Sequence, residues 1–154
     1  MKNQIFKIDN SGKSKAFFLK KNSILKKKYI SDLKKKTLKS KKDNRICLHN
    51  NKKSSLQIMI NCLIKKNIYH PHKHISVDEF YYILDGKLKI IYINEENKEL
   101  KSYILTKKSN FFYLNRNIIH YTIPITKSCT FIEARPGPFK ISDTVIYKIF
   151  KKYN

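Results

Sequence analysis

From Arg45 onward, this 154-residue sequence is a succession of short runs rich in Ile, Tyr, Phe, Val and Thr. Polar turns separate the runs at near-regular intervals, with almost no helical pattern between them. The predicted strands are residues 45–49, 56–64, 79–84, 87–94, 99–105, 111–114, 119–123, 129–134 and 144–149. Such a series favours an all-β sandwich or small barrel over a parallel sheet with crossover helices.

The first 44 residues differ in composition, since they hold fifteen lysines and three aspartates. Apolar residues recur at helical spacing among the lysines and predict an amphipathic helix over residues 23–37, with Ser23 as its N-cap. Two short strands, at residues 5–8 and 16–19, are expected before it, joined by a turn at Asn10-Ser11-Gly12.

A chain of this length fits one globular domain with one core. We divide it into a Lys-rich N-terminal extension (1–44) with one helix, a barrel (45–140) and a C-terminal strand or tail (141–154).

The net charge of +23 suggests a polyanionic partner, but only three of the 34 basic residues are arginine. Arginine is favoured over lysine for bidentate recognition of phosphates and bases, so a specific nucleic-acid surface is not expected. Lys, Asn and Ile all have AT-rich codons, and genome composition explains much of the excess. The lysines of residues 1–44 are interpreted as a solvated helix face, with a binding arm as the alternative.

No apolar run is long enough to span a membrane, and the first residues lack the pattern of a secretory signal. We therefore expect a cytoplasmic protein. The three cysteines are far apart and form no C-x-x-C pair, so they are interpreted as small buried hydrophobes.

The histidines carry the clearest chemical signal, because three of the five fall within residues 70–74. Residues two apart on a strand project to the same face, so His72 and His74 can present two imidazoles to one point. Glu79 opens the next predicted strand. Two imidazoles and one carboxylate can bind a divalent first-row metal and leave coordination positions open, and His120 can supply a fourth ligand.

His70 has the same parity as His72 and His74, but it precedes a proline at a strand end. We expect its side chain to point toward solvent rather than to bind metal.

The pattern His72-x-His74-x4-Glu79-x6-Gly86, followed later by His120, resembles the two histidine motifs of the cupin superfamily. The resemblance implies a double-stranded β-helix, the cupin jelly-roll barrel, with one metal held inside by His72, His74, Glu79 and His120. The second motif has lost its usual glycines; Asn117 stands at one of these positions and can adopt the positive φ that glycine would supply.

A closer resemblance covers residues 45–139 and is to the WbuC-type cupin-fold metalloproteins, small bacterial proteins often associated with surface-polysaccharide biosynthesis. Its residues are Arg45-Ile-Cys-Leu-His49, Gln57-x-Met59, Pro71-His72-Lys73-His74, Glu79-x6-Gly86, His120 and Gly137-Pro138-Phe139. The resemblance implies that Arg45, His49 and the Gly137-Pro138-Phe139 turn matter as well, without giving their roles.

Five further residues are candidates for the pocket wall. Arg45 and Arg135 can clamp a carboxylate or phosphate in the barrel mouth, or instead form ion pairs at a strand edge. His49 either lines the pocket or makes a structural hydrogen bond. Tyr82 and Tyr121 are expected in the core or pocket lining, where one of them can donate a hydrogen bond to a ligand.

The expected cofactor is one divalent transition metal, with Fe, Zn, Mn and Ni all suited to these ligands. The leading hypothesis is a cupin that acts on or binds a small oxygen-rich, sugar-like ligand in surface-polysaccharide biosynthesis; whether it turns over is left open. The alternatives are a non-catalytic, metal-stabilised module that docks an anionic partner, and an iron-dependent dioxygenase. A homodimer through edge strands is also expected.

Overall fold

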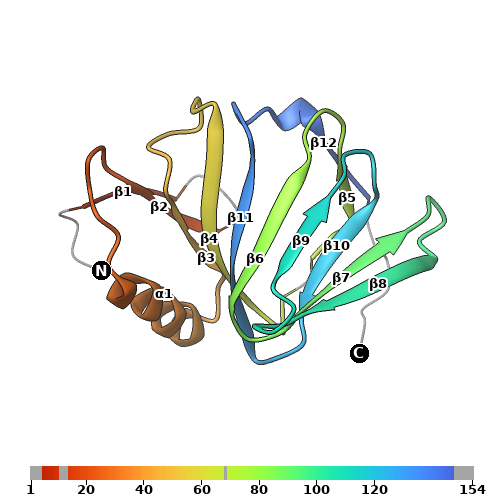
Figure 1. The fold of residues 1–154 in the computed structure, drawn as a ribbon, viewed down its shortest axis with the longest axis horizontal. Coiled ribbons are helices and arrows are strands. Elements are labelled where there is room, and N and C mark those ends of the chain that lie inside the picture. The colour runs from red at the N-terminus through yellow and green to blue at the C-terminus, as the bar shows by residue number, and fades with distance from the viewer. Residues whose placement is uncertain (1–4, 11–13, 68, 148–154) are drawn as a thin grey trace.

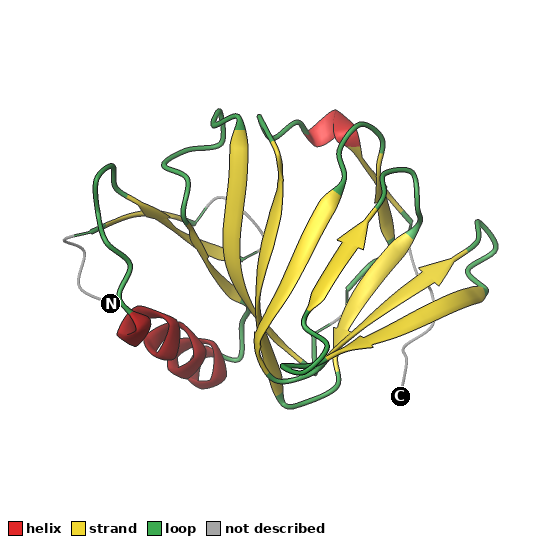
Figure 2. Ribbon diagram, viewed as in Figure 1, coloured by secondary structure: helices red, strands yellow, loops and turns green. Residues whose placement is uncertain are grey.

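The computed structural model describes residues 5–10, 14–67 and 69–147, and these form two β-sheets with one α-helix and one 3-10 helix (Figures 1 and 2). The elements in chain order are β1 (Phe6–Asp9), β2 (Lys15–Leu19), α1 (Lys27–Ser40), β3 (Asn44–Cys47), β4 (Leu56–Ile64), β5 (His72–His74), β6 (Glu79–Asp85), β7 (Leu88–Ile93), β8 (Glu99–Leu105), β9 (Phe111–Leu114), β10 (His120–Pro124), β11 (Ser128–Pro136), the 3-10 helix η1 (Ile141–Asp143) and β12 (Thr144–Ile146).

The larger sheet has the strand order β1-β2-β3-β4-β11-β6-β9, and the smaller has the order β12-β5-β10-β7-β8. Every described strand pair is antiparallel except β2 with β3. Strands far apart in sequence are neighbours, such as β11 between β4 and β6, as expected of a jelly roll rather than of simple hairpins. The all-β prediction is confirmed.

Most strand boundaries match the prediction within two residues, and β4, β8 and β9 match at both ends. The short β5 was not among the predicted strands, because three residues beside Pro71 give too little alternation to detect. The predicted strand 144–149 ends at Ile146 in the structure, and its last two positions lie outside the described residues.

The predicted N-terminal strands exist as β1 and β2, while their expected turn lies partly outside the described residues. The helix is confirmed but begins at Lys27, so the assignment of Ser23 as N-cap was wrong. Ile24 is 79% exposed, and a helical turn there would bury no apolar surface.

Helix α1 covers the outer face of the larger sheet, against β3, β4 and β11 (Figure 1). A buried cluster forms between them and contains Phe6, Phe17, Leu33, Ile46, Ile60 and Cys62. Lys34 of the helix also forms an ion pair with Asp85 at the end of β6. The described part of residues 1–44 therefore extends the same sheet and core, and the proposed division into extension and barrel stays a prediction.

Residues on both faces of strand β4 are buried. Its Ile60 and Cys62 pack toward α1, whereas Met59 and Asn61 face the smaller sheet. A second apolar cluster fills one end of the space between the sheets, with Ile83, Leu88, Ile90 and Phe131 among its members. The polar residues gather at the other end.

All three cysteines are buried and free, as expected. Burial raises the pKa of the Cys47 thiol to about 11 and that of Cys129 to about 12, so neither is a reactive thiolate at neutral pH.

No helix in the described ranges has the length and apolar character needed to cross a membrane. The outer strands β8 and β9 expose Ile104, Phe111 and Tyr113, and the homodimer expected for such edges stays a prediction.

Candidate metal centre

The four predicted ligands come from three strands that meet between the two sheets. His72 and His74 lie on β5, Glu79 opens β6 of the larger sheet, and His120 opens β10 beside β5. Antiparallel pairing of β10 with β5 places His120 opposite His72. The alternation along β5 turns both of its histidines to one side, as the spacing predicted.

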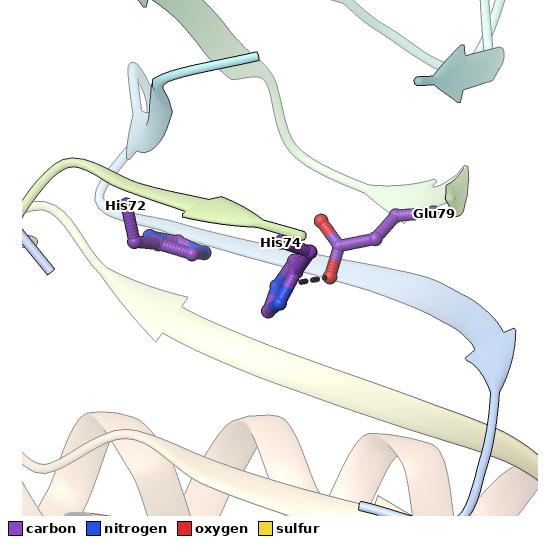
Figure 3. A group of neighbouring side chains, drawn as sticks. All are labelled: His72, His74 and Glu79. Carbon is purple, nitrogen blue, oxygen red and sulfur yellow. Dashed lines mark ion pairs between the residues drawn. The ribbon is translucent and has the colours of Figure 1, made fainter. Parts of the chain in front are cut away.

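The side chains approach one another closely. His74 Nε2 lies 3.0 Å from Glu79 Oε1, and His120 Nε2 lies 3.4 Å from Glu79 Oε2. The candidate ligand atoms of His72, His74 and Glu79 all lie within 4.8 Å of one another (Figure 3). The ring centroids of His72 and His120 are 4.5 Å apart, so the fourth residue adjoins the group.

Backbone carbonyls fix the proton position in two of the rings. His72 Nδ1 lies 3.2 Å from the His70 oxygen, and His120 Nδ1 lies 3.0 Å from the Ile118 oxygen. A carbonyl oxygen can only accept, so in the neutral rings the proton is on Nδ1 and the Nε2 lone pair is free. The Nε2 atom of His120 is buried and has no hydrogen-bond partner, and a metal ion would satisfy it.

The charge state of the group also suits a cation. Burial, together with the neighbouring His120, lowers the pKa of His72 to about 4 and keeps its ring neutral at pH 7. Burial tends to raise the pKa of Glu79, but its contacts with His120 and His74 outweigh this and hold the pKa well below its usual range. Neutral imidazoles around an ionised carboxylate are the protonation states that metal ligation requires.

His74 is held from behind by the segment that leads into β12. Its Nδ1 lies 3.1 Å from Thr144 Oγ1 and 3.5 Å from Asp143 Oδ2. Although burial raises the pKa of Asp143, hydrogen bonds from Ser76 outweigh this and keep it below its ordinary value. An ionised carboxylate behind a histidine orients the ring and increases its basicity as a ligand.

A cavity of about 820 Å³ opens beside the group. Its wall includes Arg45, Asn61, Glu133 and Arg135 of the larger sheet, and Phe139 beyond β11. Asn61 donates a 2.8 Å hydrogen bond to Glu133 Oε2. Burial and the nearby Glu79 raise the pKa of Glu133, so this carboxyl group takes up a proton more readily than an exposed glutamate. The cavity therefore combines a candidate metal centre with hydrogen-bonding and basic groups.

A family described as "Domain of unknown function (DUF6016)" matches residues 25–105, just over half of the chain. The chain belongs to this family. The matched region runs from before α1 to the end of β8, so it contains His72, His74 and Glu79 and stops before His120. A search of the curated proteins finds no match to the DUF6016 chain.

Solved structures show the fold. CapF from Staphylococcus aureus, described as a capsular polysaccharide assembling protein, aligns with 68% of the DUF6016 chain at 14% identity and a TM-score of 0.56. The protein SO0799 from Shewanella oneidensis aligns with 62% at 16% identity and a TM-score of 0.50. The aligned part spans 63% of SO0799 and 30% of CapF. The DUF6016 chain has a cupin-like jelly-roll fold, as predicted.

Two of the five predicted pocket residues line the cavity. These are Arg45 and Arg135, whereas His49, Tyr82 and Tyr121 are not among its described lining residues. The His49 ring packs edge-on against Phe18, and its Nδ1 lies 3.1 Å from the Ile58 carbonyl oxygen. These contacts support a structural role for His49 rather than a place in the pocket wall. The backbone alternation turns Tyr82 to the face opposite Tyr81, and Tyr121 packs in an apolar cluster with Ile91 and Ile119.

His70 is half-buried and lines the cavity, contrary to the expectation that it faces solvent. The short strand β5 lies between β12 and β10, so its preceding residue is not at an open edge. Asn117 has the predicted positive φ, of 64°. Its N–H donates to the His74 carbonyl at 2.7 Å, which ties the loop before β10 to β5.

Four polar residues of the candidate metal centre and its cavity were not predicted from the sequence. Tyr81 donates a 2.8 Å hydrogen bond to Glu79 Oε2, and Glu133 faces the same cavity. Alternation from Glu79 and from Arg135 could have identified both, since each lies two residues away on the same strand. Asp143 and Thr144 gave no such signal, because they contact His74 only through the pairing of β12 with β5.

Proposed function

We propose that this cupin-fold protein binds one divalent transition metal through His72, His74, Glu79 and His120, and uses it to act on or bind a small oxygen-rich, sugar-like ligand. The observation that carries the proposal is the convergence of these side chains beside a cavity, with the buried Nε2 of His120 near Glu79 but without a hydrogen-bond partner.

Three imidazoles and one carboxylate fit iron, zinc, manganese and nickel, and leave about two positions of an octahedral shell for a ligand. Such a metal, when bound, supplies Lewis acidity that polarises a carbonyl or hydroxyl oxygen. Asp143 and Thr144 orient His74 toward it, and Tyr81 holds the Glu79 carboxylate by a hydrogen bond.

The size of the cavity and its polar lining residues suit a ligand rich in oxygen. The cavity volume of about 820 Å³ lies within the range of small-molecule sites. Asn61 and the two arginines offer donors, and the Glu133 carboxyl group offers an acceptor, or a donor when it is protonated. Glu133 is the general acid or base candidate that the sequence did not reveal, because burial and the nearby Glu79 raise its pKa above the usual range of a glutamate.

A role in surface-polysaccharide biosynthesis is the finer part of the proposal. Two resemblances support it: the sequence pattern shared with the WbuC-type proteins, and the fold shared with CapF, which is described as assembling capsular polysaccharide. The cytoplasmic location expected from the sequence agrees with a role on soluble sugar intermediates.

The experiment is metal analysis of protein purified without chelators. We expect near one equivalent in the wild-type protein, lost in His72→Ala and Glu79→Ala and retained in His49→Ala, whose ring adjoins β4 outside the cavity. Unchanged metal content in the first two variants would remove the proposal. Iron as the bound metal, with ligand-dependent oxygen uptake, would favour the dioxygenase alternative.

One surface feature supports the alternative in which the chain docks an anionic partner. Helix α1 buries Leu33 and exposes Lys27, Lys28, Lys35 and Lys39. Replacing these four lysines by glutamine should abolish retention on heparin at physiological salt if they form a docking arm. Retention that persists, and fades steeply with salt, would instead reflect only the overall positive charge.

A further inference from the structure

Arg135 makes an unusual set of contacts for an arginine. Its Nη1 lies 3.3 Å from His74 Nε2 and 3.6 Å from Glu79 Oε1, and its side chain is only 11% exposed. A guanidinium N–H can only donate, so the contact with Glu79 Oε1 is made to a carboxylate lone pair, and the contact with His74 Nε2 is a hydrogen bond when the ring proton is on Nδ1. His74 Nε2 and Glu79 Oε1 are also the atoms through which these two residues would bind a metal.

The guanidinium occupies one side of the two atoms that would bind a metal. A first-row divalent ion lies about 2.0–2.2 Å from imidazole nitrogen and carboxylate oxygen ligands. A metal bound to His74 Nε2 and Glu79 Oε1 on the side that Arg135 occupies would therefore meet the guanidinium at close range, where two cations repel. Metal binding on that side requires Arg135 to move.

A second arginine lines the same cavity as Arg135. Arg45 lines the same wall, and its Nε is buried without a hydrogen-bond partner. Its described side-chain contact is between Nη1 and the weak acceptor Met59 Sδ, at 3.9 Å. The Phe139 ring lies on this wall, with its centroid 5.3 Å from the Arg135 guanidinium carbon, so an aromatic face already adjoins the side chain.

We propose that Arg135 serves as the cation of the centre when no metal is bound, and that metal binding releases it to join Arg45 in binding an anionic group of the ligand. This rests on the proposed function and narrows its ligand class to molecules that carry a carboxylate or a phosphate. Paired guanidinium groups suit both anions, since each can donate two hydrogen bonds in one plane.

The two binding events are then coupled. Metal competes with Arg135 for the same two atoms, whereas an anion draws Arg135 away from them. The anion should therefore strengthen metal binding, and by thermodynamic reciprocity the metal should strengthen anion binding by the same factor.

The first test is the Zn²⁺ affinity of the metal-free full chain, measured by titration calorimetry. Arg135→Met removes the competing cation and should bind Zn²⁺ about tenfold more tightly than wild type, within the usual range of coupling between sites. Arg135→Lys retains a cation and should stay nearer to wild type. The control is Arg116→Met, which removes the same charge from an exposed position beyond β9. Circular dichroism confirms that each variant is folded.

The second test repeats the titration with D-glucuronate, D-glucose 6-phosphate or neutral D-glucose. We expect one of the two anions to raise the Zn²⁺ affinity of wild type severalfold, which identifies the group as carboxylate or phosphate, and D-glucose to leave it unchanged. The gain should shrink in Arg45→Met and in Arg135→Met. An anion that acts only by coordinating the metal would give the same gain in all proteins, and that result overturns the anion site.

Two failures are distinguishable. Wild-type protein that binds no Zn²⁺ overturns the proposed function together with this inference. Wild-type protein that binds Zn²⁺ normally, with equal affinity in Arg135→Met, overturns the role of Arg135 alone.

Discussion

His72 and His120 face each other across neighbouring strands, with their ring centroids 4.5 Å apart, although 47 residues separate them in the sequence. The pairing of β10 with β5 makes this contact, and backbone carbonyls turn both Nε2 atoms away from their own strands. The candidate metal centre therefore depends on the register between two strands of the smaller sheet, as well as on the local motif that supplies His72, His74 and Glu79.

The carboxylate behind His74 should matter for metal affinity. We predict that Asp143→Asn weakens metal binding about 10-fold or more, because the amide retains the shape but loses the charge that increases the basicity of His74. The measurement is competition for the metal against a chromophoric chelator. Asp78→Asn is the matched control, since Asp78 binds Tyr113 and the Arg116 backbone instead. Equal losses in both variants would argue against an orienting role.

The metal-free protein should lose stability in mild acid. The pKa of His72 is about 4 in the folded state and near 6.5 when unfolded, so between these values the unfolded chain binds more protons. The free energy of unfolding should fall by a few kcal/mol as pH drops from 6.5 to 4. Glu79, whose folded pKa is also lowered, adds a loss of the same sign below pH 4.5.

Urea unfolding in the presence of EDTA at several pH values measures this effect. His72→Gln removes the titrating ring and should show a shallower dependence on pH. Parallel curves for the two proteins would mean that His72 titrates normally in the folded chain.

The turn between β6 and β7 should tolerate only glycine. Gly86 has a φ of +83°, and a Cβ there would lie 2.5 Å from the Ser128 carbonyl oxygen. Gly86→Ala should lower stability by about 1–3 kcal/mol, as measured by thermal unfolding. Asn97 also has a positive φ but stands in an exposed turn, so Asn97→Ala should cost less. A smaller loss for Gly86→Ala than for Asn97→Ala would contradict this structure of the turn.

Helix α1 should be an integral part of the core. Leu33 is fully buried against the larger sheet, and Leu33→Ala should destabilise the protein by about 2–5 kcal/mol. Lys35→Ala, at an exposed position two residues on, should change stability by less than about 0.5 kcal/mol. A similar, small effect of both changes in urea unfolding would show that the helix is only loosely attached.

The sequence predicted the strands well because most alternate or run apolar between clear turns, and β4, β8 and β9 were correct at both ends. Strand parity predicted that His72 and His74 share a face, whereas the full set with Glu79 and His120 followed from the resemblance to the cupin motifs; the structure brings the four side chains together. The pocket wall was harder to predict. Tyr82 and Tyr81 are adjacent and face opposite ways, and the prediction of Tyr82 did not apply the alternation from Glu79 that turns Tyr81 toward the cavity. The start of α1 was misplaced, because a plausible cap at Ser23 carries no information about where buried surface begins.

X-ray absorption spectroscopy of the metal-loaded protein identifies the atoms that hold the ion. We expect a coordination shell of nitrogen and oxygen atoms only, with the multiple-scattering signature of several imidazoles that weakens in His120→Ala. A shell that contains sulfur, or one that is unaltered when His120 is removed, would contradict the assignment of the metal centre to these side chains.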